Sequence, residues 1–130
     1  MSSQSQHSSA PISVQAVLAN PMEMTLGPKA AHRIVLDAVV NKRRMRSRIS
    51  PELVTALDLT VENIDWVSPL PSAEVWIEVL GRHSFHRAVI DPSITNLVIG
   101  WIVLNDLDLV VDGDPAKLRR RHPDYIIVEV

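Results

Sequence analysis

Residues 73–90 read AEVWIEVLGRHSFHRAVI and carry the clearest local pattern in the chain. Apolar and polar residues alternate on both sides of Gly81. Because the side chains of a strand point alternately to its two faces, the pattern predicts a β-hairpin. We expect its turn at Gly81-Arg82, and we expect Asp91-Pro92 to end the second strand.

Outward from the hairpin, the rest of the chain divides into further short strands separated by turn signals. Alternation or β-branched composition predicts strands over residues 12–18, 22–26, 33–40, 61–67, 97–99, 109–111 and 125–130. Ser50-Pro51-Glu52 predicts the start of a short helix, since serine is a favoured N-cap and proline suits the first helical position. A second short helix is expected over 101–107.

Many short strands with one or two short helices indicate an all-β barrel or sandwich. A weak duplication is visible, because a strand, a loop and a short helix recur at 34–59 and 97–108.

Length and composition predict one globular domain. The chain has 130 residues, of which 46% are hydrophobic. We expect a flexible, Ser/Gln-rich tail over residues 1–10 and a single domain over 11–130. No apolar run reaches the roughly 20 residues that span a bilayer, and the N-terminus lacks the apolar core of a signal peptide, so a cytoplasmic protein without membrane insertion is expected.

The usual catalytic and metal-binding motifs are absent from the sequence. Zero cysteines exclude a disulfide scaffold and a thiolate zinc site. His83 and His86 fall on opposite faces of their predicted strand, which disfavours a shared metal. The four aspartates between 106 and 114 lack the glycine and terminal glutamate of a calcium loop, so they are interpreted as helix-flanking and turn residues. We therefore predict no metal and no cofactor.

Charge is distributed unevenly along the chain. Five of the thirteen basic residues fall within seven positions, here named the basic tract, at Lys42, Arg43, Arg44, Arg46 and Arg48. The remaining chain has 8 basic against 15 acidic residues, a net charge of -7. One cationic tract therefore interrupts an otherwise acidic protein.

Two segments resemble bacterial retropepsin-like aspartic proteases. Residues 97–112, LVIGWIVLNDLDLVVD, are similar to the C-terminal signature of that family, in which a strand ending in glycine leads into a short helix and a Leu-Asp-Leu-Val-Val-Asp strand. Residues 49–59, ISPELVTALDL, look like the helical segment that follows the family's catalytic loop. The resemblance covers roughly residues 22–130 and implies a small closed β-barrel of the retropepsin type.

The same resemblance implies that catalysis has been lost. Family members have Asp-Thr-Gly-Ala after the strand that corresponds to 33–40, where this chain has Asn41, Lys42, Arg43 and Arg44. Aspartic proteases activate water with two carboxylates that share one proton, and an asparagine cannot take that part. The interval 61–72, where the family carries a glycine-containing flap, has no glycine and looks short and stiff. We expect a pseudoenzyme, with residual protease activity as the least favoured alternative.

The basic tract then becomes the candidate binding site. We expect Lys42, Arg43, Arg44, Arg46 and Arg48 to bind an acidic surface of a partner protein, because guanidinium groups bind carboxylates in two-pronged pairs. Met45 or Ile49 would anchor the tract against apolar surface, and the terminal strand 125–130 offers a homodimer contact.

Two alternatives to a protein partner remain open. The same tract, with Arg119 to Arg121, would bind nucleic acid or another anion, although the acidic remainder of the chain disfavours this. A solvated loop without a partner is the other alternative.

Overall fold

The computed structural model describes residues 11–64 and 69–123, so the predicted tail and terminal strand lie outside the described residues. Within these ranges nine strands and three short helices follow one another along the chain. In order they are β1 (Ile12–Ala19), α2 (Pro21–Leu26), β2 (Arg33–Val40), β3 (Arg48–Ile49), α3 (Pro51–Ala56), β4 (Val61–Glu62), β5 (Ser72–Val79), β6 (Arg82–Ile90), β7 (Leu97–Ile99), α4 (Trp101–Asp106), β8 (Leu109–Asp112) and β9 (Lys117–Arg120).

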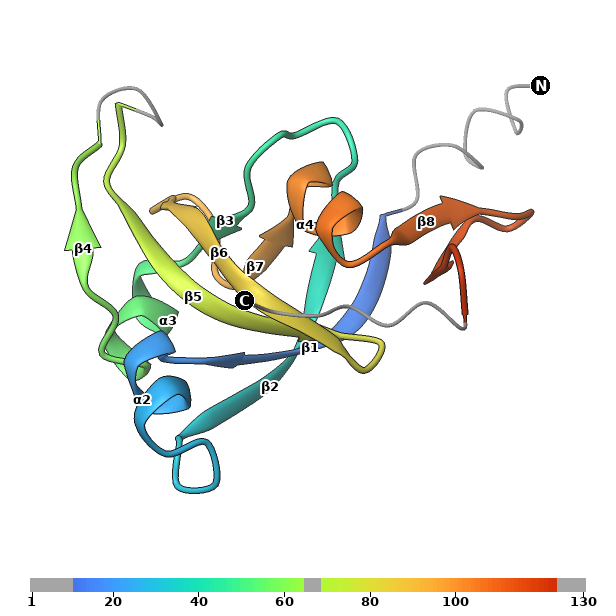
Figure 1. The fold of residues 1–130 in the computed structure, drawn as a ribbon. Helices are drawn as coiled ribbons and strands as arrows, with labels where there is room; N and C mark the ends of the chain where they lie inside the picture. The colour runs from blue at the N-terminus through green and yellow to red at the C-terminus, as the bar shows by residue number, and fades with distance from the viewer. Residues whose placement is uncertain (1–10, 65–68, 124–130) are drawn as a thin grey trace.

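Six strands close into a β-barrel, which confirms the all-β prediction. The order is β1-β2-β7-β3-β6-β5, and β5 pairs back onto β1 to complete the ring. β4 adds to the outer edge of β5, while β8 and β9 form a separate two-stranded hairpin at the side of the barrel (Figure 1). Inward-facing aliphatic side chains from the six strands, together with those of α3 and α4, fill the interior.

The predicted hairpin is present as β5 and β6, but its turn lies one residue earlier than expected. Val79 pairs with Arg82, so the two-residue turn is Leu80-Gly81. Both turn residues have positive φ, 52° and 79°, the combination that joins twisted strands tightly. The shift makes Arg82 the first residue of β6, with its side chain on the inner face of the barrel.

Residues 22–26 form helix α2, so the prediction of a strand there was wrong. Asn20 is the N-cap, and its side chain accepts hydrogen bonds from the backbone N–H groups of Met22 and Glu23. Pro21 occupies the first helical position, where a missing N–H costs nothing. The apolar side chains that alternate over residues 22–26 do not form the buried face of a strand, since no residue of α2 is buried.

The helix predicted from Ser50 is confirmed as α3, and the helix predicted over 101–107 is confirmed as α4. The Ser50 hydroxyl accepts a hydrogen bond from the backbone N–H of Leu53. The interval 61–72 begins with β4, which pairs with the start of β5; residues 65–68 lie outside the described ranges.

The structure contains an internal repeat, longer than the sequence suggested. Residues 33–59 and 83–109 have the same order of strand, crossing loop, short strand and helix, fifty positions apart. Both helices end in the same way, at Asp58 and Asp108, with φ of 52° and 54°. The second copy therefore begins at the start of β6 and not at residue 97.

The two copies interlock through their crossing loops. Loop 41–47 leaves β2, passes β7 and returns as β3, so β7 lies between two strands that follow each other in sequence. Loop 91–96 leaves β6, passes β3 and returns as β7 in the same way. The backbone N–H groups of Asn41 and Asp91 donate to Ile99 and Ile49 at 2.9 and 3.0 Å, so each copy holds the other.

Side chains from outside the repeat hold the C-terminal ends of both helices. Asn20 donates to the carbonyl oxygens of Leu57 and Asp58 after α3, at 3.1 and 2.8 Å. Arg82 donates to the corresponding carbonyls of residues 107 and 108 after α4, at 3.0 and 3.1 Å. These carbonyls have no partner within their own helix, and leaving such groups unpaired would be costly where they are buried.

Gly100 stands where loop 41–47 crosses the start of α4. A Cβ at this position would lie 2.7 Å from the carbonyl oxygen of Met45 and 2.8 Å from the carbonyl carbon of Arg46. Both are backbone atoms, so neither can rotate away. The crossing therefore requires glycine for space rather than for backbone freedom.

Gly100→Ala is expected to destabilise the fold by about 2 kcal/mol, as overpacking in a tight site does. Gly27→Ala is the matched control, because nothing lies within 4 Å of a Cβ there, and it should change stability by less than about 0.5 kcal/mol. Urea unfolding of both variants measures the difference. Equal stability of the two would show that the crossing is not tight.

Candidate functional site

Loop 41–47, which carries most of the basic tract, is held by its backbone. The carbonyl oxygens of Arg44 and Met45 accept hydrogen bonds from the N–H groups of Trp101 and Ile102, at 2.8 and 3.2 Å. The Ser47 hydroxyl accepts from the N–H of Gly100 at 2.9 Å. Gly100 has no side chain with which to cap α4, so the loop supplies the cap. In Figure 1 the loop arches over α4 at the top of the molecule.

Because the backbone faces inward, the charged side chains of loop 41–47 face outward. Lys42, Arg43 and Arg44 are exposed, and Arg46 is half-buried. Within the described ranges none of these four makes an ion pair with a carboxylate. The structure thus brings four uncompensated cations together on a fixed loop.

Apolar surface accompanies these cations. The Met45 side chain is 54% exposed and Trp101, whose N–H is bonded to the loop, is 39% exposed. Ile49 is fully buried in the barrel core. Of the two residues expected to anchor the tract, only Ile49 does so, and Met45 remains on the surface.

Arg48 differs from the other members of the tract because it is internally paired. Its guanidinium donates to the Asp91 carboxylate at 2.9 Å, and its side chain is only one quarter exposed. Arg48 opens β3 and Asp91 follows β6, so the pair joins neighbouring strands at the point where the two crossing loops meet. The Arg48 charge is therefore neutralised within the protein by Asp91.

Asp91 is held ionised by its surroundings. The hydroxyl and the backbone N–H of Ser93 donate to one carboxylate oxygen at 2.6 and 2.9 Å. These bonds, followed by the bond from Arg48, lower the pKa of Asp91 from 3.8 to about 2. A carboxylate with these partners carries a fixed negative charge and does not exchange a proton near neutral pH.

Asn41 and Asp91 occupy equivalent positions in the two copies of the repeat. The Asn41 side-chain oxygen accepts from the backbone N–H of Arg43, as Asp91 accepts from that of Ser93. β2 and β6 are separated by β7 and β3, so the two residues follow strands that are not neighbours. Each side chain accepts a hydrogen bond from its own loop, so both serve to fold their loops.

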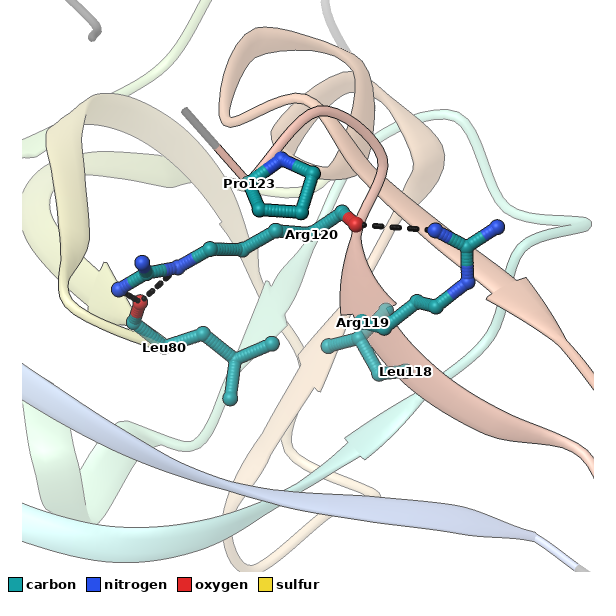
Figure 2. Close-up of a pocket in the computed structure, with 5 residues that line it drawn as sticks. All are labelled: Leu80, Leu118, Arg119, Arg120 and Pro123. Atoms are coloured by element: carbon teal, nitrogen blue, oxygen red, sulfur yellow. Dashed lines mark hydrogen bonds between the residues drawn. The ribbon is translucent and has the colours of Figure 1, made fainter. Parts of the chain in front are cut away.

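The second basic cluster, Arg119 to Arg121, is engaged within the protein. Arg119 pairs with Asp112 at 2.5 Å, and Arg121 lies 3.9 Å from Asp108. Arg120 donates to the carbonyl oxygen of Leu80 (Figure 2).

A surface pocket of about 540 Å³ lies beside this second cluster. It is lined by Leu80, Leu118, Arg119, Arg120 and Pro123. Figure 2 shows aliphatic walls crossed by the Arg120 side chain, whose guanidinium is turned toward Leu80. Two of the three arginines of the cluster are therefore paired with carboxylates, and Arg120 is bonded to a backbone carbonyl oxygen.

A polar cluster on the inner side of β6 was missed by sequence reasoning. Arg82 and His86 are buried there, at 7% and 6% exposure. His86 lies 2.5 Å from the Ser84 hydroxyl and 3.5 Å from Asp106, both contacts being to the same ring nitrogen. The alternation in β6 predicts two faces but does not say which of them points into the barrel. The sequence alone therefore does not show that Arg82, Ser84 and His86 lie on the inner face.

Asp108 joins this cluster to the end of the described chain. Burial raises the pKa of Asp108, but hydrogen bonds and charge from His122, with the charge of Arg121, hold it below its ordinary value. The Arg119 guanidinium likewise holds the pKa of Asp112 below its usual range. The interpretation of these aspartates as turn and helix-flanking residues agrees with their contacts.

His83 and His86 lie on opposite faces of β6, as expected. His83 is exposed and its ring lies 5.1 Å from that of Trp76. Among the described residues there is no group of three or more side chains that could hold a metal ion, and no helix there is long and apolar enough to cross a membrane.

Comparison of the chain with known protein families and with curated proteins found no match. The candidate site therefore rests on the chain's own geometry.

The Asp91 carboxylate makes the free energy of unfolding depend on pH in the acid range. Because its pKa in the folded protein lies below the ordinary 3.8, Asp91 stabilises the fold above about pH 4, and this contribution disappears as the pH falls toward 2. Asp91→Asn should be less stable than the original protein at pH 6, and the difference should shrink steadily below pH 4.

Urea unfolding midpoints at pH 6, 4, 3 and 2 measure the effect. Asp58→Asn is the control, since Asp58 is exposed and makes no ion pair within the described ranges. A stability difference between the original protein and Asp91→Asn that stays constant down to pH 2 would contradict the assignment.

Proposed function

We propose that this protein is a non-catalytic binding subunit that docks onto an acidic surface of a partner protein through Lys42, Arg43, Arg44 and Arg46. The observation that carries the proposal is that these four cations lie together on a loop fixed by its backbone and have no carboxylate partner in the described structure. Five other arginines are paired with acidic groups: Arg48, Arg82, Arg87, Arg119 and Arg121. Uncompensated charge concentrated at one place favours a site for an oppositely charged partner.

A fixed loop strengthens such a site. Loop 41–47 is already ordered by its bonds to α4, so binding would spend little further backbone entropy. Arginine side chains suit carboxylates because the planar guanidinium donates two parallel hydrogen bonds. Met45 and Trp101 add exposed apolar area beside the cations, which is the combination found in the energetic centres of protein interfaces.

The retropepsin-like ancestry belongs to the same proposal. A closed barrel with two interlocked crossing loops is compatible with it. Loss of catalysis is supported by Asn41 at the expected aspartate position and by Asp91, whose carboxylate is bound by Ser93 and Arg48. A shared proton needs two carboxylates in contact, and position 41, which corresponds to the family's aspartate, supplies none.

Binding through the tract predicts a large effect of removing its charge. The variant Lys42→Gln/Arg43→Gln/Arg44→Gln/Arg46→Gln should keep the fold and lose at least about tenfold in affinity for a polyglutamate peptide, since charge-assisted bonds contribute about 1.5–3 kcal/mol each. The control is Lys29→Gln/Lys117→Gln, which removes two exposed cations that lie outside the basic tract, and it should change affinity by less than about twofold.

A random single-stranded oligonucleotide distinguishes the anion-binding alternative. Tighter binding to the oligonucleotide than to polyglutamate, with affinity falling steeply as salt rises, would replace the proposal with nucleic-acid binding. In the native host, a protein partner should co-purify in stoichiometric amount with the original chain and not with the four-residue variant. A monomer that captures no partner would count against the proposal.

Absence of proteolysis is the second expectation. The purified protein should not cleave a mixture of fluorogenic peptides between pH 3 and pH 6, and Asn41→Asp should not restore cleavage, because Lys42 and Arg43 still stand where the family has threonine and glycine. Cleavage that a transition-state analogue abolishes would overturn the pseudoenzyme proposal.

A further inference from the structure

The first half of β2 is an open strand edge. β2 pairs with β1 along its whole length, but on its other side it pairs with β7 only at Val39 and Val40. Within the described ranges no strand lies beside Arg33 to Asp37 on that second side. In Figure 1 this part of β2 forms the lower margin of the barrel.

The backbone groups on this edge can be assigned from two hydrogen bonds. The N–H of Asn41 donates to β7, and the carbonyl oxygen of Asp37 accepts from the Asn96 side chain, so alternate residues counted back from 41 face away from β1. Arg33 and Val35 continue this set. Their N–H and C=O groups point outward from the sheet edge, where an added strand would find them.

The side chains of the same three residues lie on the outer face of the barrel. Arg33, Val35 and Asp37 are all exposed, whereas Ala38 and Val40 are buried. Val35 is 58% exposed, a large value for a valine in the middle of a strand. An exposed edge of this kind invites strand addition.

The sequence of this edge is complementary to itself. In an antiparallel pair of two β2 strands centred on Val35, Val35 faces its own copy and Arg33 faces Asp37 of the second chain, twice by symmetry. The outward backbone groups at 33, 35 and 37 then meet as hydrogen-bonded pairs, in which the Asp37 carbonyl oxygen, already bonded to the Asn96 side chain, uses its second lone pair. Opposite charges at directly opposed positions stabilise such pairings, and a twofold axis satisfies both at once.

We propose that a second copy of this chain docks on the β2 edge by antiparallel pairing in the register Val35 to Val35, with Arg33 of each copy against Asp37 of the other. The Arg33 guanidinium now lies 5.9 Å from the Trp76 ring centre. To pair with Asp37 of the second copy, this side chain would have to turn away from Trp76.

The repeat supplies a contrast. The positions on β6 that correspond to this edge are His83, Phe85 and Arg87, fifty residues later. Antiparallel self-pairing about Phe85 would place His83 opposite Arg87, with no acidic group in either position. Arg87 is moreover paired with Glu62 at 2.8 Å. The edge of β2 is therefore complementary in charge to a second copy of itself, whereas the corresponding residues of β6 are not.

A contact of one strand edge is small, so the dimer is expected to be weak. Stable protein interfaces bury about 1,200–2,000 Å², and a single short strand pair falls below that range. We expect a dissociation constant in the range of about 10–500 µM. Sedimentation equilibrium between about 10 µM and 1 mM, with the full-length protein, covers this range.

Charge exchange across the register is the decisive experiment. Arg33→Asp and Asp37→Arg should each weaken the dimer at least about tenfold, because each places like charges opposite one another. The double variant Arg33→Asp/Asp37→Arg restores opposite charges and should return the original dissociation constant. Lys29→Glu, a charge change in the exposed turn before β2, is the control and should have no effect.

Three outcomes distinguish pairing at the β2 edge from dimerisation through a different surface. A monomer up to about 1 mM, or failure of the double variant to recover while it remains folded by circular dichroism, overturns the proposal. Loss of the dimer in full-length Ile127→Asp but not in Arg33→Asp would assign dimerisation to the terminal segment instead. The four-residue variant of the basic tract should dimerise normally, so failure of the proposed partner binding leaves this test intact.

Discussion

Three backbone N–H groups at the start of α4 have no partner in their own helix, and loop 41–47 provides acceptors for all three. The contact is possible only because residue 100 is glycine, since any Cβ there would lie within 3 Å of loop backbone. Much of the structure depends on this crossing. It holds β7 between β2 and β3, while the other crossing loop, 91–96, places β3 between β6 and β7.

The same crossing explains why the basic tract is exposed. The carbonyl oxygens of Arg44 and Met45 and the Ser47 hydroxyl accept hydrogen bonds from the start of α4. The side chains of residues 42–45 are exposed, and three of these four are cationic. The exception is Arg48, which already belongs to β3 and reaches the Asp91 carboxylate at 2.9 Å. The basic tract therefore has two parts. Arg48 is paired with Asp91 inside the fold, whereas the four cations from Lys42 to Arg46 lie at the surface without a carboxylate partner in the described residues.

Local chemistry accounts for what could be predicted. The β5–β6 hairpin followed from alternation, and α3 followed from Ser50 and Pro51, because strand alternation and helix capping act between residues close in sequence. The strand expected at 22–26 was wrong for the complementary reason. Its apolar alternation had no sheet to face, and the Asn20 cap, which also bonds to the end of α3, decided in favour of a helix.

The sequence by itself determined the all-β class, the two helices after Ser50 and Gly100, the concentration of charge at 42–48 and the presence of asparagine at position 41. Only the tertiary structure decided which arginines are compensated, that Asn41 and Asp91 are equivalent, and that β2 has an open edge. The physical reason is range. Turns and caps form between neighbouring residues, whereas ion pairs, barrel closure and open edges depend on strands distant in sequence that meet only in the folded chain.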